Sequence, residues 1–399
     1  MILKGSVYIA GAGVISAIGN SWSENYFALQ NSMTGIGGMM VLDSIHEDVP
    51  VGEVKLTNHE LAYRTGASSS LSRTALLGIH AAKEAYLDSG IRNMRFWRVG
   101  LVSATTVGGM DRTEKFYPAF LNDPGKGKLH DVVNHECGRI TERIADALEI
   151  DGYVSTINTA CSSSVNSIIY GARLIRHNHL DVVFAGGTDA LTKFTLNGFN
   201  SLMILDKALC KPFDASRNGL NLGEGAGFVV LVSERVMEEE ELTPIARVSG
   251  YANTNDAFHQ TASSPEGRGS FAAMKNALEM ARLNSTDVDY VNLHGTGTLN
   301  NDLSEGTAVK RLFGEQYPRM SSTKSFTGHT LGACGGIEAV YSLMSIREQA
   351  VFPNLRFESP MPEVGIMPQL NFEKTKVDHV MSNSFGFGGN CSSIIFSKH

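Results

Sequence analysis

Short runs of hydrophobic residues alternate with longer amphipathic segments along the chain. Four of these runs are rich in β-branched residues and contain or adjoin glycine, which is typical of buried strands. They cover residues 6–14, 98–107, 180–190 and 226–234. The segment 69–90 instead repeats its apolar positions every three or four residues and stops at Gly90, which predicts a helix. The alternation of the two patterns predicts an α/β protein whose sheets are largely covered by helices.

The same plan is repeated after an acidic run at residues 238–241. We interpret this run as a solvated helix end at the hinge between two halves, 1–238 and 239–399. The second half shows strand patterns at 245–254 and 288–298 and helix patterns at 269–284 and 328–349. No sequence identity between the halves is visible, so the pattern alone suggests a duplicated architecture without establishing it.

Composition narrows the class of protein. At 399 residues the chain is too long for one ordinary core, and its net charge of −7 argues against nucleic-acid binding. No stretch reaches the roughly 18 apolar residues of a membrane span. The cysteines are odd in number and form no Cys-x-x-Cys pair, which indicates neither a zinc site nor a disulfide framework. We therefore expect a cytoplasmic protein with no metal, no membrane span and no nucleic-acid partner.

The stretch GAGVIS at residues 11–16 offers the first two glycines of a dinucleotide-binding fingerprint. Its third position is Ser16, and no convincing acidic residue follows after a second strand. A tight turn between a strand and a helix is the better interpretation.

Cys161 lies in NTACSSS, between a strand-like and a helix-like segment. Buried cysteines are common in cores, so the residue taken alone favours a structural role. A strand–turn–helix elbow would instead aim backbone N–H groups and the helix dipole at the side chain. That setting would lower the thiol pKa and supply one donor for an oxyanion.

Two histidines also lie at the ends of predicted elements. His294 follows a strand and precedes a Gly-Thr-Gly-Thr loop, and His329 precedes a glycine- and alanine-rich helix, where a helix N-terminus favours the neutral imidazole. Lys324 and Glu338 flank His329; as a buried pair they would hold the histidine region and fix its protonation, and otherwise they are surface charges. Near the end of the chain, Phe385 and Phe387 alternate with glycines, a pattern that suits a gate over an apolar pocket.

Five separated motifs together resemble the elongating β-ketoacyl-[acyl carrier protein] synthases. They are TACSSS, PFDASRNGLNLGEGAGFVVL, HGTGTLNND, STKSFTGHTLGACGG and FGFGG, in the family's order and at its approximate spacings. The resemblance implies the thiolase fold, a five-layered αβαβα body built from two related halves. It also implies a homodimer, or a heterodimer with a related chain-length subunit.

The resemblance implies a decarboxylative Claisen condensation that needs no metal or organic cofactor. An acyl chain held on Cys161 would react with malonyl-[acyl carrier protein], and His294 and His329 would act on the malonyl thioester. The resemblance also implies that Lys324 and Glu338 support the histidines, and that the N–H groups of Cys161 and Phe387 form an oxyanion hole. Phe387 would act as a gate, with Phe385 beside it. Thr296 and Thr298 would contact the pantetheine, and Val107 would form a wall of the acyl pocket.

Two departures from the family pattern bear on substrate and partner. Ser68, Ser69 and Ser70 stand where many members carry basic pairs for the carrier protein, and Arg64 and Arg73 flank the serines. We therefore expect docking that is shifted, weaker or specific for a particular carrier. After the gate glycines, Asn390 and Cys391 replace the usual Thr-Asn. Three serines after the nucleophile resemble polyketide synthases, which leaves polyketide or polyene elongation level with fatty-acid elongation.

Other functions stay open at this stage. The chain-length partner of such a synthase would normally lack Cys161. A coenzyme A-dependent thiolase would need a second catalytic cysteine near the C-terminus, where Cys391 lies. An initiating synthase would use Cys-His-Asn, which His329 opposes. A carrier-binding protein without catalysis is the non-enzyme alternative.

Overall fold

The computed structural model describes residues 5–399, and its strands form one large sheet and a small two-stranded sheet. In chain order the strands are β1 (Val7–Ser16), β2 (Val99–Ala104), β3 (Tyr153–Ile157), β4 (Val182–Asp189), β5 (Gly225–Ser233), β6 (Ala246–Asn255), β7 (Tyr290–Asn292), β8 (Arg319–Ser321), β9 (Ala350–Val351), β10 (Glu373–Lys374), β11 (His379–Phe385) and β12 (Asn390–Ser397).

The large sheet consists of two sets of strands with the same order. The N-terminal set runs β3-β2-β4-β5-β1 and the C-terminal set, read from its outer edge, runs β8-β7-β11-β12-β6. In each set, the first strand along the chain pairs antiparallel with the fifth, and the fifth pairs antiparallel with the fourth. The second strand pairs parallel with both the third and the fourth. The sets meet where β1 pairs with β6. This repeated order confirms the duplicated architecture.

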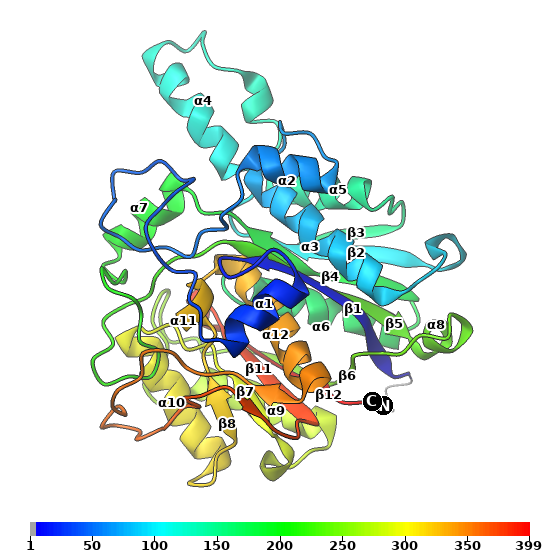
Figure 1. The fold of residues 1–399 in the computed structure, drawn as a ribbon, viewed down its shortest axis with the longest axis vertical. Helices are drawn as coiled ribbons and strands as arrows, with labels where there is room; N and C mark the ends of the chain where they lie inside the picture. The colour runs from blue at the N-terminus through cyan, green and yellow to red at the C-terminus, as the bar shows by residue number, and fades with distance from the viewer. Residues whose placement is uncertain (1–4) are drawn as a thin grey trace.

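Helices cover the two sets of strands and separate them. They are α1 (Trp22–Gln30), α2 (Asn58–Thr65), α3 (Arg73–Ser89), α4 (Met110–Asn122), α5 (Cys137–Ala147), α6 (Ser163–Arg176), α7 (Lys193–Ser201), α8 (Glu234–Glu239), α9 (Arg268–Ala281), α10 (Leu299–Phe313), α11 (Lys324–Thr327) and α12 (Cys334–Glu348). In Figure 1, α6 and α12 lie between the sets, with α3 outside the N-terminal set and α9 and α10 outside the C-terminal one. The α/β class and the αβαβα layering predicted from the sequence are confirmed.

The hydrophobic core follows these layers. One apolar cluster fills the central layer around α6 and α12, and two others lie beneath the outer helices. From Cys334 to Ile346 every residue of α12 is buried, as expected for a helix that faces a sheet on both sides. Because α6 and α12 enter the middle of the body, the residues at their N-terminal ends meet there.

The turn expected at residues 11–16 is wrong, because β1 runs without a break through them. A Cβ atom on Gly13 would lie 2.1 Å from the carbonyl oxygen of Ala81 on α3. The glycine therefore allows the helix backbone to cross directly over the strand, and it forms neither a turn nor a nucleotide site.

The boundary between the halves at residues 238 and 239 falls in the last turn of α8, before β6 begins. It stays a prediction.

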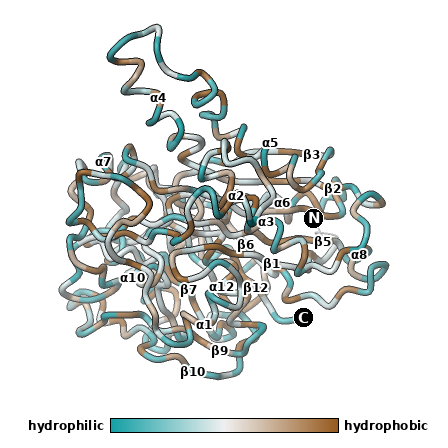
Figure 2. Tube along the Cα trace, turned by 45° about the horizontal axis from the view of Figure 1, so that its top comes forward, coloured by the Kyte–Doolittle hydropathy of each residue, from teal (hydrophilic) through white to brown (hydrophobic). Residues whose placement is uncertain are grey.

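An arm built around α4 projects from the body. Figure 1 and Figure 2 show it standing clear of the layers, with hydrophobic positions among the hydrophilic ones. Several of its apolar side chains are exposed, namely Tyr117, Leu121, Leu129 and Val133. Among residues 5–399, no helix is long and apolar enough to cross a membrane.

Candidate active site

Cys161 lies on the predicted elbow, between the end of β3 and the start of α6. The turn depends on Ala160, whose φ of 54° places it in the left-handed region that non-glycine residues rarely adopt. The hydroxyl of Ser163 secures this backbone, because it accepts from the N–H of Thr159 at 2.8 Å and donates to the carbonyl of Ala160. The strained turn therefore presents Cys161 at the N-terminal end of a buried helix.

The expected lowering of the thiol pKa is wrong for the free protein. Burial raises the pKa of Cys161, because a thiolate removed from water loses its solvation. The backbone N–H of Phe387 and the charge of Lys324 act in the opposite direction without overcoming it. The N–H of Phe387 is thus already placed to stabilise negative charge beside Sγ.

The turn at residues 386–389 packs directly against the elbow. A Cβ atom on Gly386 would lie 3.0 Å from the backbone nitrogen of Cys161, so any larger residue would force the two backbones apart by a few tenths of an ångström. The ring of Phe387 stacks on Phe199 of α7, with centroids 5.9 Å apart, and Phe385 is buried beside the ring of His294.

The fold brings His294 and His329 to the same place from different elements. His294 follows β7 and His329 follows α11, and their rings stand perpendicular with centroids 5.5 Å apart. Sγ of Cys161 and one ring nitrogen of each histidine all lie within 4.8 Å of one another. Three residues distant in the sequence therefore form one compact, buried group.

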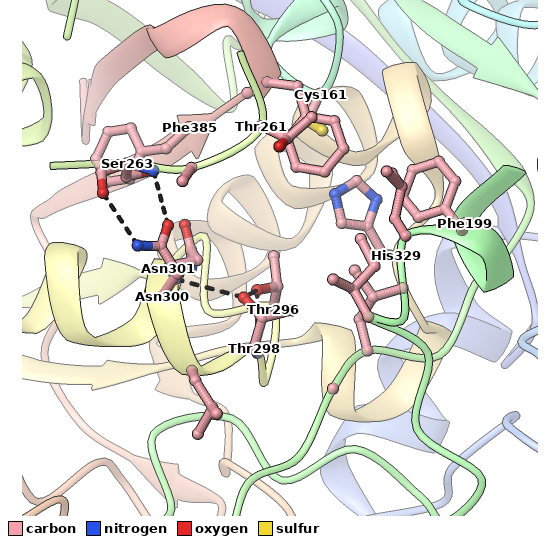
Figure 3. Close-up of a pocket in the computed structure, with 18 of the residues that line it drawn as sticks. Cys161, Phe199, Thr261, Ser263, Thr296, Thr298, Asn300, Asn301, His329 and Phe385 are labelled. Carbon is pink, nitrogen blue, oxygen red and sulfur yellow. Dashed lines mark hydrogen bonds between the residues drawn. The ribbon is translucent and has the colours of Figure 1, made fainter. Parts of the chain in front are cut away.

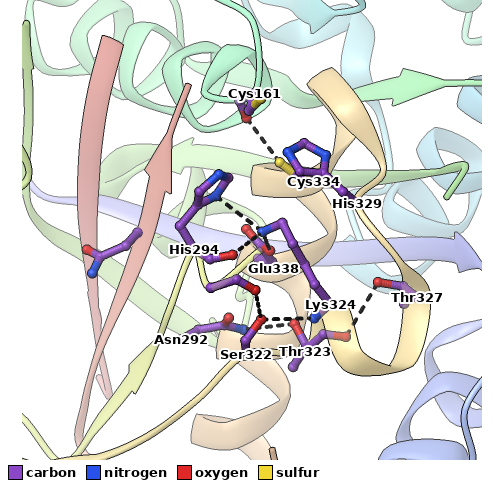
Figure 4. A network of polar contacts seen from close by, with 12 residues as sticks. Cys161, Asn292, His294, Ser322, Thr323, Lys324, Thr327, His329, Cys334 and Glu338 are labelled. Carbon is purple, nitrogen blue, oxygen red and sulfur yellow. Dashed lines mark hydrogen bonds and ion pairs between the residues drawn. The ribbon is translucent and has the colours of Figure 1, made fainter. Parts of the chain in front are cut away.

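Hydrogen bonds fix the proton on each imidazole, and Figure 4 shows the one between His294 and Lys324. The backbone N–H of Leu331 donates to Nδ1 of His329 at 3.0 Å, and Nζ of Lys324 lies 3.2 Å from Nδ1 of His294. Because Nδ1 accepts in both rings, Nε2 carries the hydrogen of each neutral imidazole. Each histidine thus presents an N–H donor.

Burial is the main reason that both histidines are neutral. It lowers the pKa of His329 to about 3 and that of His294 well below its usual value, and the charge of Lys324 adds to both effects. The explanation expected from the sequence was a helix N-terminus, but α12 begins only at Cys334, after a short 3-10 turn. The two imidazoles are neutral, as predicted, but burial and not a helix N-terminus is the cause.

Lys324 and Glu338 form a buried ion pair, so the alternative of two surface charges is excluded. Nζ of Lys324 also donates to the backbone carbonyl of His294 at 2.7 Å. Burial raises the pKa of Glu338 to about 7, although Lys324 opposes this shift. For Lys324, burial opposes the ammonium form but the Glu338 carboxylate outweighs it, and the pKa is raised. The pair anchors His294 through two of its atoms.

Two cavities open onto Cys161. The first has a volume of about 260 Å³ and is lined by both histidines, Thr296 and Thr298, whose hydroxyls lie 2.9 Å apart (Figure 3). The second has a volume of about 230 Å³ and is mostly apolar, and Val107 lines it. Cys161, Phe199 and Phe387 border both, so the stacked phenylalanines stand between them.

The chemistry of the site favours anion stabilisation over cation binding. Cys161, His294 and His329 have the spacing of a metal-ligand set, as do His294, Cys334 and Glu338. The ammonium of Lys324 beside His294 repels a cation, however, and the Nε2–H groups are donors rather than lone pairs.

Several residues of the site have no signal in the sequence patterns considered above. Glu305 of α10 accepts from the N–H groups of His294 and Gly295 at 2.9 and 2.8 Å, and it holds the loop that carries His294. The thiol of Cys334 donates to the carbonyl of Cys161 at 3.1 Å. An acidic residue shortly after the Gly-Thr-Gly-Thr loop is a sequence signal for Glu305, whereas Phe199 has none, because its partner lies far along the chain.

Other residues named from the sequence lie elsewhere. Ser68, Ser69 and Ser70 lie in the turn between α2 and α3, but Arg73 is buried in an ion pair with Glu224. Arg73 flanks the serines along the chain but offers no free charge to a carrier protein, because its guanidinium is fully engaged inside the protein.

Cys391 does not line either cavity around Cys161. It is packed in the outer apolar cluster beside Ser270, and burial raises its pKa to about 12. Cys391 therefore does not take the place of the second catalytic cysteine that the thiolase alternative requires.

Comparisons with known proteins agree with this geometry. Residues 6–236 match the family model described as beta-ketoacyl synthase, N-terminal domain, and residues 245–358 match that of the C-terminal domain. The chain is 32% identical to a 3-oxoacyl-[acyl-carrier-protein] synthase 2 from Staphylococcus aureus, over 98% of both chains. It is also 32% identical to the protein of the same name from Coxiella burnetii, over 99% of both.

Superposition on solved structures identifies the fold. The ishigamide ketosynthase/chain length factor superposes with a TM-score of 0.93 at 26% identity, covering 99% of each chain. A ketosynthase in complex with its chain length factor from Xenorhabdus doucetiae gives 0.84 at 30% identity, covering 100% of this chain and 99% of that one. The thiolase fold predicted from the sequence is confirmed, and the chain belongs to the beta-ketoacyl synthase family.

Proposed function

We propose that this chain catalyses decarboxylative condensation of an acyl chain, held as a thioester on Cys161, with malonyl-[acyl carrier protein], giving 3-oxoacyl-[acyl carrier protein]. The observation that carries the proposal is the convergence of Sγ of Cys161 with one nitrogen of each neutral histidine within 4.8 Å. A nucleophile and two N–H donors at this spacing suit a reaction that builds negative charge on oxygen and carbon.

In the first step, Sγ of Cys161 attacks the acyl-carrier thioester. The oxyanion that forms is stabilised by the backbone N–H groups of Cys161 and Phe387, which both act on Sγ already in the free protein. The carrier thiolate leaves and takes the proton that Cys161 lost. The acyl chain then occupies the apolar cavity bordered by Val107.

In the second step, malonyl-carrier enters the other cavity. Loss of carbon dioxide leaves an enolate, whose oxygen accepts hydrogen bonds from Nε2–H of His294 and of His329. The enolate carbon attacks the acyl carbonyl on Cys161, the C–S bond breaks, and the thiolate takes up a proton. Lys324 and Glu338 act by holding His294, and Thr296 and Thr298 bind the pantetheine amides.

The gate belongs to the same proposal. Phe387, supported by Phe385 and stacked on Phe199, separates the two cavities. Entry of the acyl chain requires the ring of Phe387 to turn away from Phe199, which the glycines on either side permit.

We further propose that the chain acts as a dimer, with a second copy or with a related chain-length subunit. β3 is an outer strand of the large sheet, with Tyr153 and Val154 partly exposed on it, and such an edge invites a second strand. The exposed apolar residues of the α4 arm lie on the same half of the molecule. The solved ketosynthase complexes with chain length factors favour the heterodimer as the second candidate.

Intact-protein mass spectrometry with a panel of acyl-carriers tests the function. A mass increase equal to the acyl group, absent in Cys161→Ala, is expected with at least one fatty-acyl or polyketide-type chain. Cys210→Ala serves as the matched control, because Cys210 is also buried but borders neither cavity. The absence of any adduct on Cys161 and of carbon dioxide release from malonyl-carrier would refute the proposal.

A further inference from the structure

We propose that Glu114 on the α4 arm sets the width of the cavity for the acyl chain, and so selects the chains that Cys161 accepts. The inference rests on the proposed function and adds a specificity-determining residue to it. Glu114 does not touch either cavity itself and acts by positioning α7.

The apolar cavity is lined by the elbow, by Phe387, by Leu331 and Gly332, and by two further segments. Val107 lies in the loop before α4 and Met110 is the first residue of that helix, whereas Phe194, Thr195 and Phe199 come from α7. These segments are far apart in the sequence, and α7 has an exposed side. The volume of the cavity therefore depends on how closely α7 is held to α4.

Glu114 joins the two segments directly. It lies one turn beyond Met110, its Oε1 accepts from the N–H of Phe194 at 2.5 Å, and its Oε2 accepts from the N–H of Lys193 at 3.1 Å. These are the first two N–H groups of α7, which have no partner within the helix, and the hydroxyl of Thr192 accepts the third. A carboxylate is the strongest acceptor for this position because the helix dipole adds to both hydrogen bonds.

The surroundings leave α7 as the part that moves if this link is lost. The base of α4 is held separately, because Oδ2 of Asp111 accepts from the N–H of Arg73 at 2.9 Å. Leu191, two residues before α7, is also fixed, because its N–H donates to Oε2 of the buried Glu224 at 3.0 Å. Without Glu114, α7 can turn about the point held at Leu191, and Phe194 and Phe199 move with it.

The test compares acylation of Cys161 by carriers with acyl chains of graded length. Glu114→Ala is expected to raise the rate for chains beyond the wild-type limit about tenfold relative to short chains, since one methylene in an apolar pocket is worth this much. Glu114→Gln keeps one oxygen acceptor and should shift the profile partly. Carbon dioxide release from malonyl-carrier should stay within about twofold, because both histidines keep their partners.

The matched control is Glu142→Ala, which removes an exposed glutamate of α5 paired only with Arg139. A wild-type length profile in Glu114→Ala, or an equal loss for all lengths, would overturn the inference, because a merely structural role gives either result. If Glu114→Ala does not fold, the profile of Glu114→Gln decides. Failure of the wild type itself to acylate would instead count against the proposed function.

Discussion

The backbone N–H of Leu331 donates to Nδ1 of His329 at 3.0 Å, and the φ of 53° at Leu331 is part of the tight turn that makes this contact. A leucine in the left-handed region is strained, and the surrounding buried turn holds it there. The contact decides the tautomer of His329 without any other side chain, so Nε2–H is available as a donor. Lys324 does the same for His294 with a charged group.

This relationship predicts the outcome of replacing His329. His329→Ala should lower the rate of carbon dioxide release from malonyl-carrier by about 100- to 1,000-fold, the usual loss for one oxyanion donor. Acylation of Cys161 should continue, because its donors are backbone N–H groups. His329→Gln, which can offer an amide N–H, should recover part of the rate. Unchanged decarboxylation in His329→Ala would contradict the assigned role.

The ion pair of Lys324 and Glu338 should affect stability and activity in different ways. Lys324→Met leaves Glu338 buried without its partner and should lower the free energy of unfolding by about 3–5 kcal/mol. The double variant Lys324→Met/Glu338→Leu removes both charges and should regain most of this loss, yet decarboxylation should stay low because Nδ1 of His294 has lost its donor. Urea unfolding and carbon dioxide release measure the two quantities. If the double variant recovered both the free energy of unfolding and the rate of decarboxylation, the ion pair would have only a structural role.

Gly386 predicts a defect confined to the first step. The methyl group of Gly386→Ala would meet the backbone nitrogen of Cys161 at 3.0 Å and push the gate turn away from the elbow. Misplacing an oxyanion donor should slow acylation of Cys161 by about tenfold or more. The φ of −101° suits alanine, so stability should change little. Gly37→Ala is the control, since its methyl group meets nothing within 4 Å.

Burial of Glu338 and His329 predicts opposing effects of pH on stability. The pKa of Glu338 is about 7 in the folded protein against an ordinary 4.5, so the folded state binds a proton there that the unfolded chain lacks, and the free energy of unfolding falls as pH rises from 4.5 to 7. The pKa of His329 is about 3 against 6.5, so its contribution rises as pH rises from 3 to 6.5.

Between pH 4.5 and 6.5 both residues change the free energy of unfolding, Glu338 downward and His329 upward as pH rises. Each changes it by about 1.4 kcal/mol per pH unit. Glu338→Gln removes the contribution that lowers the free energy of unfolding as pH rises. The free energy of unfolding of this variant should therefore increase with pH more steeply than that of the wild type in this range. His329→Asn should have the opposite effect. Urea unfolding at a series of pH values checks both, and parallel curves for all three proteins would contradict the assignment.

Much of the fold could be predicted because its signals are local. The runs at 180–190 and 226–234 became β4 and β5, and Gly90 ends α3 in the left-handed conformation, as its position after the last apolar repeat predicts. The glycines of β1 misled the same reasoning. Their purpose is contact with α3, and nothing within residues 11–16 indicates which helix crosses the strand.

The sequence by itself determined the α/β class and, through five separated motifs, the candidates Cys161, His294 and His329, and it suggested two halves without establishing them. Only the tertiary structure decided their chemical states, because solvation and hydrogen-bond partners depend on residues distant in the chain. Burial makes the thiol of Cys161 harder to ionise, whereas the elbow alone would have made it easier. The pairing of Phe199 with Phe387 and the link from Glu114 to α7 likewise exist only after folding, since the partners come from different elements.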